Sequence, residues 1–271
     1  MASIRNHTSV DVTKLLLVGD SGSGKTATLA TLANAGYNLR ILDFDDGLAI
    51  LPEFLNKDAV DRVSFVTLKD PINKAEAFRK GANLIGNWRD GDEDYGPVSK
   101  WTSKDVLVID SLTLMGETAL RGALVFNNKK PTEQASQPEW GTAARDVQNI
   151  IQYITGSEVP CNVVVTTHMQ YMEGETGVSK AYPTSVGSKL STKLGRYFNC
   201  VCRIDTIKTS KRTERTLRTV SDHSMDLKVT SPSLLEPNVA LDLAKLFEAI
   251  QKNARKKLSE DNVINLNTGG K

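Results

Sequence analysis

The sequence has no long apolar run, and this absence already limits what the protein can be. None of its apolar stretches approaches the roughly 18 consecutive residues that a membrane-spanning helix needs. The N-terminal segment 1–14 also lacks the apolar stretch of a signal peptide. We therefore expect a cytoplasmic protein without a membrane partner. With 39% hydrophobic and 24% charged residues among 271, a fibrous or largely disordered chain is excluded.

Cysteine and net charge are also scarce. The chain has three cysteines, and two of them, Cys200 and Cys202, lie in one strand-like stretch. This number and spacing provide neither a disulfide framework nor the ligands of a structural zinc site, so we expect reduced thiols. The 34 Lys and Arg residues almost balance the 32 Asp and Glu residues, which leaves a net charge of +2. Any contact with nucleic acid must therefore come from a local basic surface.

Short apolar runs alternate with helical patterns along the chain. Buried strands are predicted at 14–18, 39–43, 62–68, 106–110 and 162–167, and an antiparallel pair near the sheet edge at 199–208 and 213–220. Helices are predicted at 25–35, 73–88 and 239–257, with two more between 110 and 162. Polar loops are predicted at 89–97, 127–138 and 174–187.

This alternation predicts one α/β domain with a mainly parallel sheet. We place the domain at residues 14–258, between a flexible leader, 1–13, and a mobile tail, 259–271.

The segment Gly19–Thr26 fits the pattern G-x-x-x-x-G-K-[ST], directly after a predicted strand and at the start of a predicted helix. In such a P-loop, backbone N–H groups converge on phosphate oxygens, Lys25 neutralises the β- and γ-phosphates, and the Thr26 hydroxyl binds Mg²⁺. A simple Gly/Ser turn would have no use for a lysine at this offset. The predicted nucleotide-binding residues are Gly19, Asp20, Ser21, Gly22, Ser23, Gly24, Lys25, Thr26 and Ala27.

A P-loop also needs an acid at the carboxyl end of a neighbouring strand to hold the magnesium ion. The run Val106–Asp110 supplies one after four apolar residues. Taken alone, Asp110 could equally cap the helix that follows it. Together with the P-loop it favours a metal site formed by Thr26 and Asp110.

Polar side chains end two further strands at the edge where a parallel sheet presents its ligand site. Asp43, Asp45 and Asp46 follow the second strand, where a carboxylate could orient the water that attacks the γ-phosphate. The alternative is a solvated turn closed by Gly47. His168 ends the strand at 162–167 and is either a γ-phosphate sensor or an ordinary surface histidine.

The order of these parts resembles the ATPase core of RecA-type recombinases. It is also similar to the short phage-encoded ATPases that keep only this core and assist single-strand annealing and recombination. The resemblance covers about residues 15–220 and rests on the P-loop, the acid-rich strand end, and the segments Val106–Ser111, Trp140–Arg145 and Val163–His168. It implies a three-layer P-loop NTPase with a RecA-like, mainly parallel sheet and an antiparallel edge hairpin. It further implies a DNA-stimulated ATPase that binds ATP and Mg²⁺.

By this resemblance the catalytic residues are Lys25, Asp45, Asp110 and His168. Asp45 matches the water-activating carboxylate of the family, although many recombinases carry glutamate there, and the shorter acid could make hydrolysis slow. His168 falls where recombinases often have glutamine, the residue that links the γ-phosphate to a DNA-binding loop.

The polar segments 127–140 and 169–187 fall where the two DNA-contacting loops of the family lie. The resemblance therefore implies single-stranded DNA as a partner. The candidate contacts are Lys129, Lys130, Tyr171, Lys180 and Tyr182. Without the resemblance each of them is an ordinary loop residue, and Trp140 is a packing anchor at a helix start.

The basic segment 208–215 contains Lys208, Lys211, Arg212 and Arg215. It lies where this family can send cations to the nucleotide of a neighbouring subunit, and its alternative is a solvated hairpin turn. We expect a homo-oligomer, although the leader 1–13 is short and polar for a segment that docks on the next subunit.

Two other functions are compatible with the sequence. The first is a small-molecule P-loop kinase, which would need an arginine-rich lid, whereas the helix after Asp110 offers only Arg121. The second is a nucleotide-dependent assembly module that hydrolyses little ATP.

Overall fold

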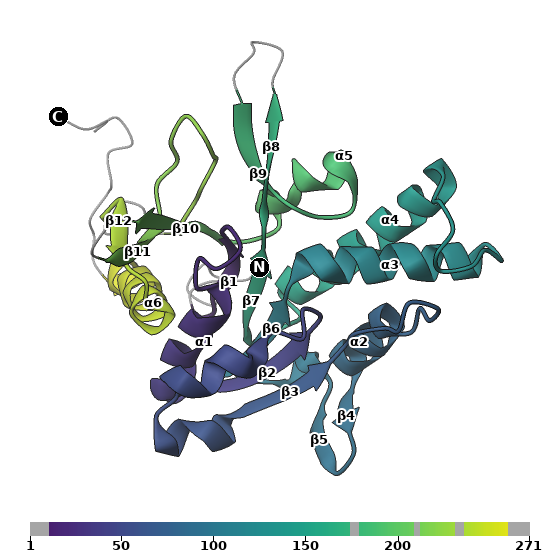
Figure 1. Cartoon of the computed structure of the whole chain (residues 1–271). Helices are drawn as coiled ribbons and strands as arrows, with labels where there is room; N and C mark the ends of the chain where they lie inside the picture. Colours follow the sequence, from purple (N-terminus) through teal and green to yellow (C-terminus); the bar gives the residue numbers. More distant parts are fainter. Residues whose placement is uncertain (1–10, 174–178, 209–211, 231–235, 260–271) are drawn as a thin grey trace.

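In the computed structural model, which describes residues 11–173, 179–208, 212–230 and 236–259, one mixed sheet organises the chain (Figure 1). The strand order is β12-β11-β10-β1-β7-β6-β2-β3. These strands are β1 (Lys14–Val18), β2 (Asn38–Asp43), β3 (Val63–Thr67), β6 (Asp105–Asp110), β7 (Asn162–Thr167), β10 (Cys200–Lys208), β11 (Thr213–Arg218) and β12 (Asn238–Ala240). Strands β10 to β3 run parallel, and β11 and β12 are antiparallel at one edge. The predicted mainly parallel sheet with an antiparallel edge is confirmed.

Helices cover both faces of the sheet and complete three layers (Figure 1). One face packs against α1 (Lys25–Asn34) and α6 (Leu243–Ser259). The other packs against α2 (Ala77–Gly86), α3 (Leu112–Phe126), α4 (Gln137–Thr155) and α5 (Gly187–Ser191). Short 3₁₀ segments lie at Leu48–Phe54, Lys57–Arg62, Val98–Lys100 and Leu194–Arg196. No helix within the described ranges is long and apolar enough to cross a membrane.

The central strands are continuously apolar because both of their faces are buried. In β1, Leu15 and Leu17 pack on the α1 and α6 side, whereas Leu16 and Val18 pack on the α3 and α4 side. All four side chains are fully buried. Two residues that the sequence assigned to the leader also join the domain, since Val12 and Thr13 are buried and the Thr13 N–H donates to Asn162 Oδ1 at 2.7 Å.

Two segments that the polar pattern predicted as loops contain β-hairpins. Strands β4 (Trp88–Asp90) and β5 (Glu93–Gly96) pair over the predicted loop 89–97, and β4 also includes Trp88, which was predicted to end the helix before it. Strand β8 (Met169–Glu173), directly before the predicted loop 174–187, pairs with β9 (Ser179–Pro183) inside it, and residues 174–178 between them lie outside the described chain. The prediction was wrong because pairing of backbone groups needs no apolar alternation along a two-stranded hairpin.

Two predicted helices begin later than expected, and at the start of each an aspartate carboxylate accepts backbone N–H groups. The Asp70 carboxylate accepts the N–H groups of Glu76 and Ala77, so α2 starts at Ala77 and not at residue 73. Asp242 accepts the N–H of Lys245, so the predicted helix at 239–257 starts at Leu243. The residues before it form β12, which pairs with β11.

The connection between α3 and α4 is held by one buried acid. The Glu139 carboxylate accepts hydrogen bonds from the Ser136 N–H at 2.8 Å, the Ser136 hydroxyl at 2.7 Å, Asn127 Nδ2 at 2.6 Å and Lys129 Nζ at 2.9 Å. The Ser136 hydroxyl, with Lys129 and Asn127, holds the pKa of Glu139 well below its usual range. Pro138, expected to end the break, lies instead in the first turn of α4, where a missing N–H is tolerated.

Gly116 allows α3 to approach the segment that follows the β8–β9 hairpin. A Cβ at this position would lie 2.8 Å from Val186 Cγ2, closer than packed atoms come. Gly122, on the same helix, has open space around its missing side chain.

Gly116→Ala is therefore expected to lower the free energy of unfolding by about 1–3 kcal/mol, since the new methyl group must displace a stiff, buried valine. Gly122→Ala is the matched control, and it should raise the stability by up to about 1 kcal/mol because alanine favours the helix. Urea denaturation of both variants measures the difference. Equal stabilities would contradict the close contact between α3 and Val186.

Candidate nucleotide-binding site

The P-loop connects β1 to α1 at the carboxyl edge of the sheet. Gly22 and Gly24 have φ values of 73° and 100°, in the left-handed region that favours glycine. Lys25 is 7% exposed, and its Nζ donates to the carbonyls of Gly19 and Asp20, both at 2.9 Å. Burial lowers the pKa of Lys25, whereas the nearby Asp110 and Asp45 carboxylates act to raise it. The loop therefore combines left-handed glycines at the start of a helix with a partly desolvated cation, both of which a phosphate site uses.

Asp110 ends β6 and lies against the start of α1. Its carboxylate accepts the Thr26 hydroxyl at 2.7 Å and a short hydrogen bond from the Thr166 hydroxyl of β7. Burial raises the pKa of Asp110, and the two hydroxyl donors oppose this shift. Thus the structure brings the two predicted metal-binding residues, Thr26 and Asp110, into contact.

The oxygen donors at this point fit a magnesium ion. Mg²⁺ is bound in proteins through one or two side-chain oxygens together with substrate phosphates. The Thr26 hydroxyl and the Asp110 carboxylate supply such a pair next to the P-loop. Within the described ranges, no group of three or more His, Cys, Asp or Glu side chains forms a metal cluster of its own. Mg²⁺ bound here would hold and neutralise the β- and γ-phosphates.

The three acids at the end of β2 each have a separate hydrogen-bond or ion-pair partner, although the charge of Asp45 still acts to raise the pKa of Asp43. Asp45 Oδ1 accepts the N–H of Ser111 at 2.9 Å and its hydroxyl at 2.7 Å. Asp46 forms an ion pair with Lys69 at 3.1 Å. Asp43 is buried, accepts the Gly47 N–H at 3.3 Å, and has a pKa that desolvation raises. Among the three, Asp45 is the acid that lines the cleft beside the P-loop.

His168 follows β7, which lies between the P-loop strand β1 and the Asp110 strand β6. Its side chain lines the same cleft as Lys25, Asp45 and Asp110. The Thr113 hydroxyl lies 3.3 Å from His168 Nδ1 and accepts the backbone N–H at 3.1 Å. Burial, and then the charge of Lys25, lowers the pKa of His168. The four predicted catalytic residues are therefore close together, although their roles remain predictions.

The cleft has a volume of about 620 Å³ and extends from the P-loop along the exposed side of α1. Part of its wall comes from residues that the sequence patterns did not reveal. Ile50 and Phe54, from the 3₁₀ segment after β2, are 39% and 52% exposed although they are apolar, and Leu241 lies on the wall with Arg215. Such side chains suit the flat, apolar faces of a nucleotide base.

The predicted DNA contacts fall into two separate groups. Lys129 and Lys130 lie between α3 and α4, and the ammonium of Lys129 is paired with Glu139. Tyr171, Lys180 and Tyr182 lie on the β8–β9 hairpin, where Gln170 pairs with Tyr182 and Met172 with Lys180. This register places Tyr171 on one face of the hairpin, and Lys180 and Tyr182 on the opposite face. Lys180 forms an ion pair with Asp226 at 2.7 Å, whereas Tyr171 is 63% exposed.

A parallel sheet in which one strand separates the P-loop strand from the Asp110 strand, with helices on both faces, defines a RecA-like P-loop NTPase. The chain belongs to the AAA domain family AAA_24, whose model matches residues 12–230. It is thus a P-loop ATPase, with ATP and Mg²⁺ as the ligands that the family implies. No curated protein matches its sequence.

Several solved structures are similar to this chain. One is the flagellar accessory protein FlaH from Methanocaldococcus jannaschii, with 10% identity, a TM-score of 0.42 and 83% of each chain covered. Another is the KaiC-like protein PH0186 from Pyrococcus horikoshii OT3, with 13% identity, a TM-score of 0.39, and 76% of this chain and 77% of that chain covered. A third is an ATPase from the type III secretion system of pathogenic bacteria, with 11% identity, a TM-score of 0.43, and 74% of this chain and 56% of that chain covered.

Asp110→Asn is expected to reduce magnesium-dependent ATP hydrolysis by at least about 10- to 100-fold, since even a group that only orients a metal ligand contributes this much. Nucleotide affinity in magnesium-free buffer should change little, because the P-loop backbone contacts do not involve the carboxylate. Titration with and without Mg²⁺ measures both quantities. An equal loss of affinity in the two buffers would show that Asp110 is structural.

Proposed function

We propose that the protein uses ATP hydrolysis to control binding of single-stranded DNA, in support of recombination or strand annealing. The observation that carries the proposal is the position of His168. This residue lines the nucleotide cleft, and it directly precedes β8, the first strand of an exposed hairpin. His168 therefore connects the nucleotide cleft to the base of the hairpin.

The base of the hairpin is held on both sides of His168. The His168 carbonyl accepts the Thr184 N–H at 2.8 Å, directly after β9. The Thr167 hydroxyl donates to the Thr184 carbonyl at 2.6 Å. A shift of His168 toward a γ-phosphate would consequently move both strands of the hairpin, and with them Tyr171. Exposed aromatic rings are the side chains on which unpaired bases stack.

Hydrolysis itself is assigned to Asp45. The Ser111 N–H and hydroxyl share Oδ1 of this carboxylate, and no hydrogen bond from a described residue reaches Oδ2. Oδ2 can therefore accept a hydrogen bond from the attacking water, while Ser111 fixes the orientation of the carboxylate. Lys25 and the P-loop amides would stabilise the negative charge on the transferred phosphoryl group.

Asp45→Asn should retain ATP but slow turnover by about 10²- to 10⁴-fold, because the amide cannot take the proton of the water. Asp43→Asn and Asp46→Asn are matched controls one to two residues away. Single-turnover hydrolysis and nucleotide titration separate chemistry from binding. Wild-type turnover in Asp45→Asn would move the catalytic role to another group.

The DNA assignment is tested by binding of a fluorescent single strand to the full chain, with and without ATP, over a range of salt concentrations. Binding should be tighter with ATP and should weaken as salt increases, since phosphate contacts release counterions. Tyr171→Ala should weaken binding by about 5- to 100-fold, as expected for a lost stack with one base, whereas Tyr171→Phe keeps the ring. Melting temperatures check that both variants fold.

Absence of salt-sensitive binding in ATP would exclude the DNA role. Hydrolysis assays with candidate nucleoside acceptors would then test phosphoryl transfer to a small molecule as the remaining enzymatic alternative.

A further inference from the structure

Arg215 belongs to the basic segment 208–215, which could reach the nucleotide of a neighbouring subunit by the resemblance to recombinases, yet its side chain lies in the nucleotide cleft of its own chain. It lines this cleft together with Gly22, Gly24 and Lys25. Its Nη2 lies 3.4 Å from the Gly22 carbonyl oxygen. A Cβ placed on Gly24 would lie only 3.3 Å from Arg215 Cδ. The Arg215 side chain thus lies against the P-loop where the P-loop borders the cleft.

The direction of this side chain follows from the alternation of β11. Leu217, two residues further on, packs into the apolar cluster on the α1 side of the sheet. Arg215 shares that face because strand side chains alternate, and α1 begins at the P-loop. Arg218 lies on the opposite face. The same strand therefore directs one arginine to the nucleotide cleft and another away from it.

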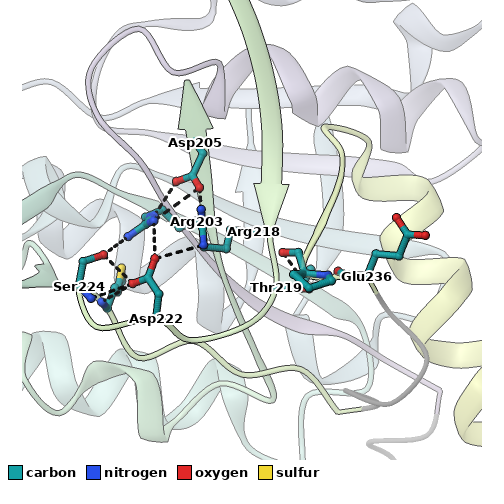
Figure 2. A network of polar contacts seen from close by, with 9 residues as sticks. Arg203, Asp205, Arg218, Thr219, Asp222, Ser224 and Glu236 are labelled. Carbon is teal, nitrogen blue, oxygen red and sulfur yellow. Dashed lines mark hydrogen bonds and ion pairs between the residues drawn. The ribbon is translucent and has the colours of Figure 1, made fainter. Parts of the chain in front are cut away.

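On that opposite face, a network of ion pairs fixes β11 to β10 (Figure 2). Asp205 of β10 accepts from Arg203 Nε at 2.7 Å and from Arg218 Nε at 2.5 Å. Asp222, in the turn after β11, contacts Arg203 at 3.0 Å and Arg218 at 3.2 Å. The Arg203 side chain is 11% exposed and that of Asp205 19%, so solvent screens these pairs less than surface pairs.

The network places Arg215 relative to the P-loop through the sheet. Arg203 is the register partner of Val18, the last residue of β1 before Gly19. Arg218 pairs with Arg203 across β10 and β11. The P-loop strand, β10 and β11 are consequently three adjacent strands of one sheet, and the ion pairs lie level with the start of the P-loop. Arg215 is carried by a fixed strand and not by a free turn.

We propose that Arg215 binds the β-phosphate of the nucleotide held by its own chain. The contact between the Arg215 guanidinium and the Gly22 carbonyl is long for a hydrogen bond, so breaking it costs little free energy. A phosphate oxygen offers a shorter, charge-assisted bond and can accept two N–H groups of the planar guanidinium at once. To bind the nucleotide of a neighbouring subunit, the Arg215 side chain would have to leave the cleft that it already lines.

The first test is nucleotide affinity. Arg215→Ala should weaken both ADP and ATP about tenfold, the loss of one charge-assisted hydrogen bond, because both nucleotides carry the β-phosphate. Arg215→Lys should recover only part of the affinity, since lysine keeps the positive charge but cannot donate the two parallel hydrogen bonds of a guanidinium. Arg212→Ala, three residues away and outside the cleft, is the matched control and should bind like the wild type. Unchanged affinity in Arg215→Ala, or a loss confined to ATP, would overturn the proposal.

The second test asks whether Arg215 acts on the nucleotide of its own subunit or on that of a neighbouring subunit. Arg215→Ala retains an intact P-loop, and Lys25→Ala retains an intact Arg215. Hydrolysis by a mixture of these variants should equal the sum of their separate rates if each arginine serves its own chain. A rate above this sum would show that Arg215 acts on a neighbour's nucleotide and would refute the assignment. This result is independent of DNA binding, so failure of the function proposed above leaves it unaffected.

Discussion

The nucleotide site depends on one buried carboxylate, that of Asp110. Its side chain is 1% exposed, and burying a charge there is costly unless donors surround it. Thr26 of α1 and Thr166 of β7 provide these donors, and Lys25 provides an opposite charge nearby. The first turn of α1, the end of β6 and the end of β7 are therefore joined at a single point. This arrangement is possible only because β7 lies between the P-loop strand and the Asp110 strand.

The sequence was sufficient to predict the parts of the site that are local. The P-loop, Asp110 and the acid at 45 each follow an apolar strand, and the carboxyl ends of parallel strands meet at one edge of the sheet. The pattern could not tell which of Asp43, Asp45 and Asp46 faces the cleft. That distinction depends on Ser111 and Lys69, which lie on other elements. Only the tertiary arrangement brings these partners to the acids.

The cleft wall and the two hairpins could not be predicted for a different reason. Arg215 is 193 positions from Gly22 in the chain, and their proximity results from the position of β11 in the sheet. The β4–β5 hairpin keeps much of its surface in solvent and is anchored by few side chains, notably Trp88 and Tyr95. Apolar periodicity therefore gives little signal for it. Larger elements, whose faces are buried, were found within a few residues of their ends.

The buried Glu139 has a consequence for any molecule that lands between α3 and α4. Because the Glu139 carboxylate already accepts hydrogen bonds from Asn127, Lys129 and Ser136, the conformation of this connection is fixed without a partner. Binding to a preorganised surface gives up little conformational entropy. It also requires no slow ordering step after the encounter, so association at this point is limited by collision and orientation. A partner for such a fixed connection would have to match its shape, whereas an adaptable loop could adjust to many shapes.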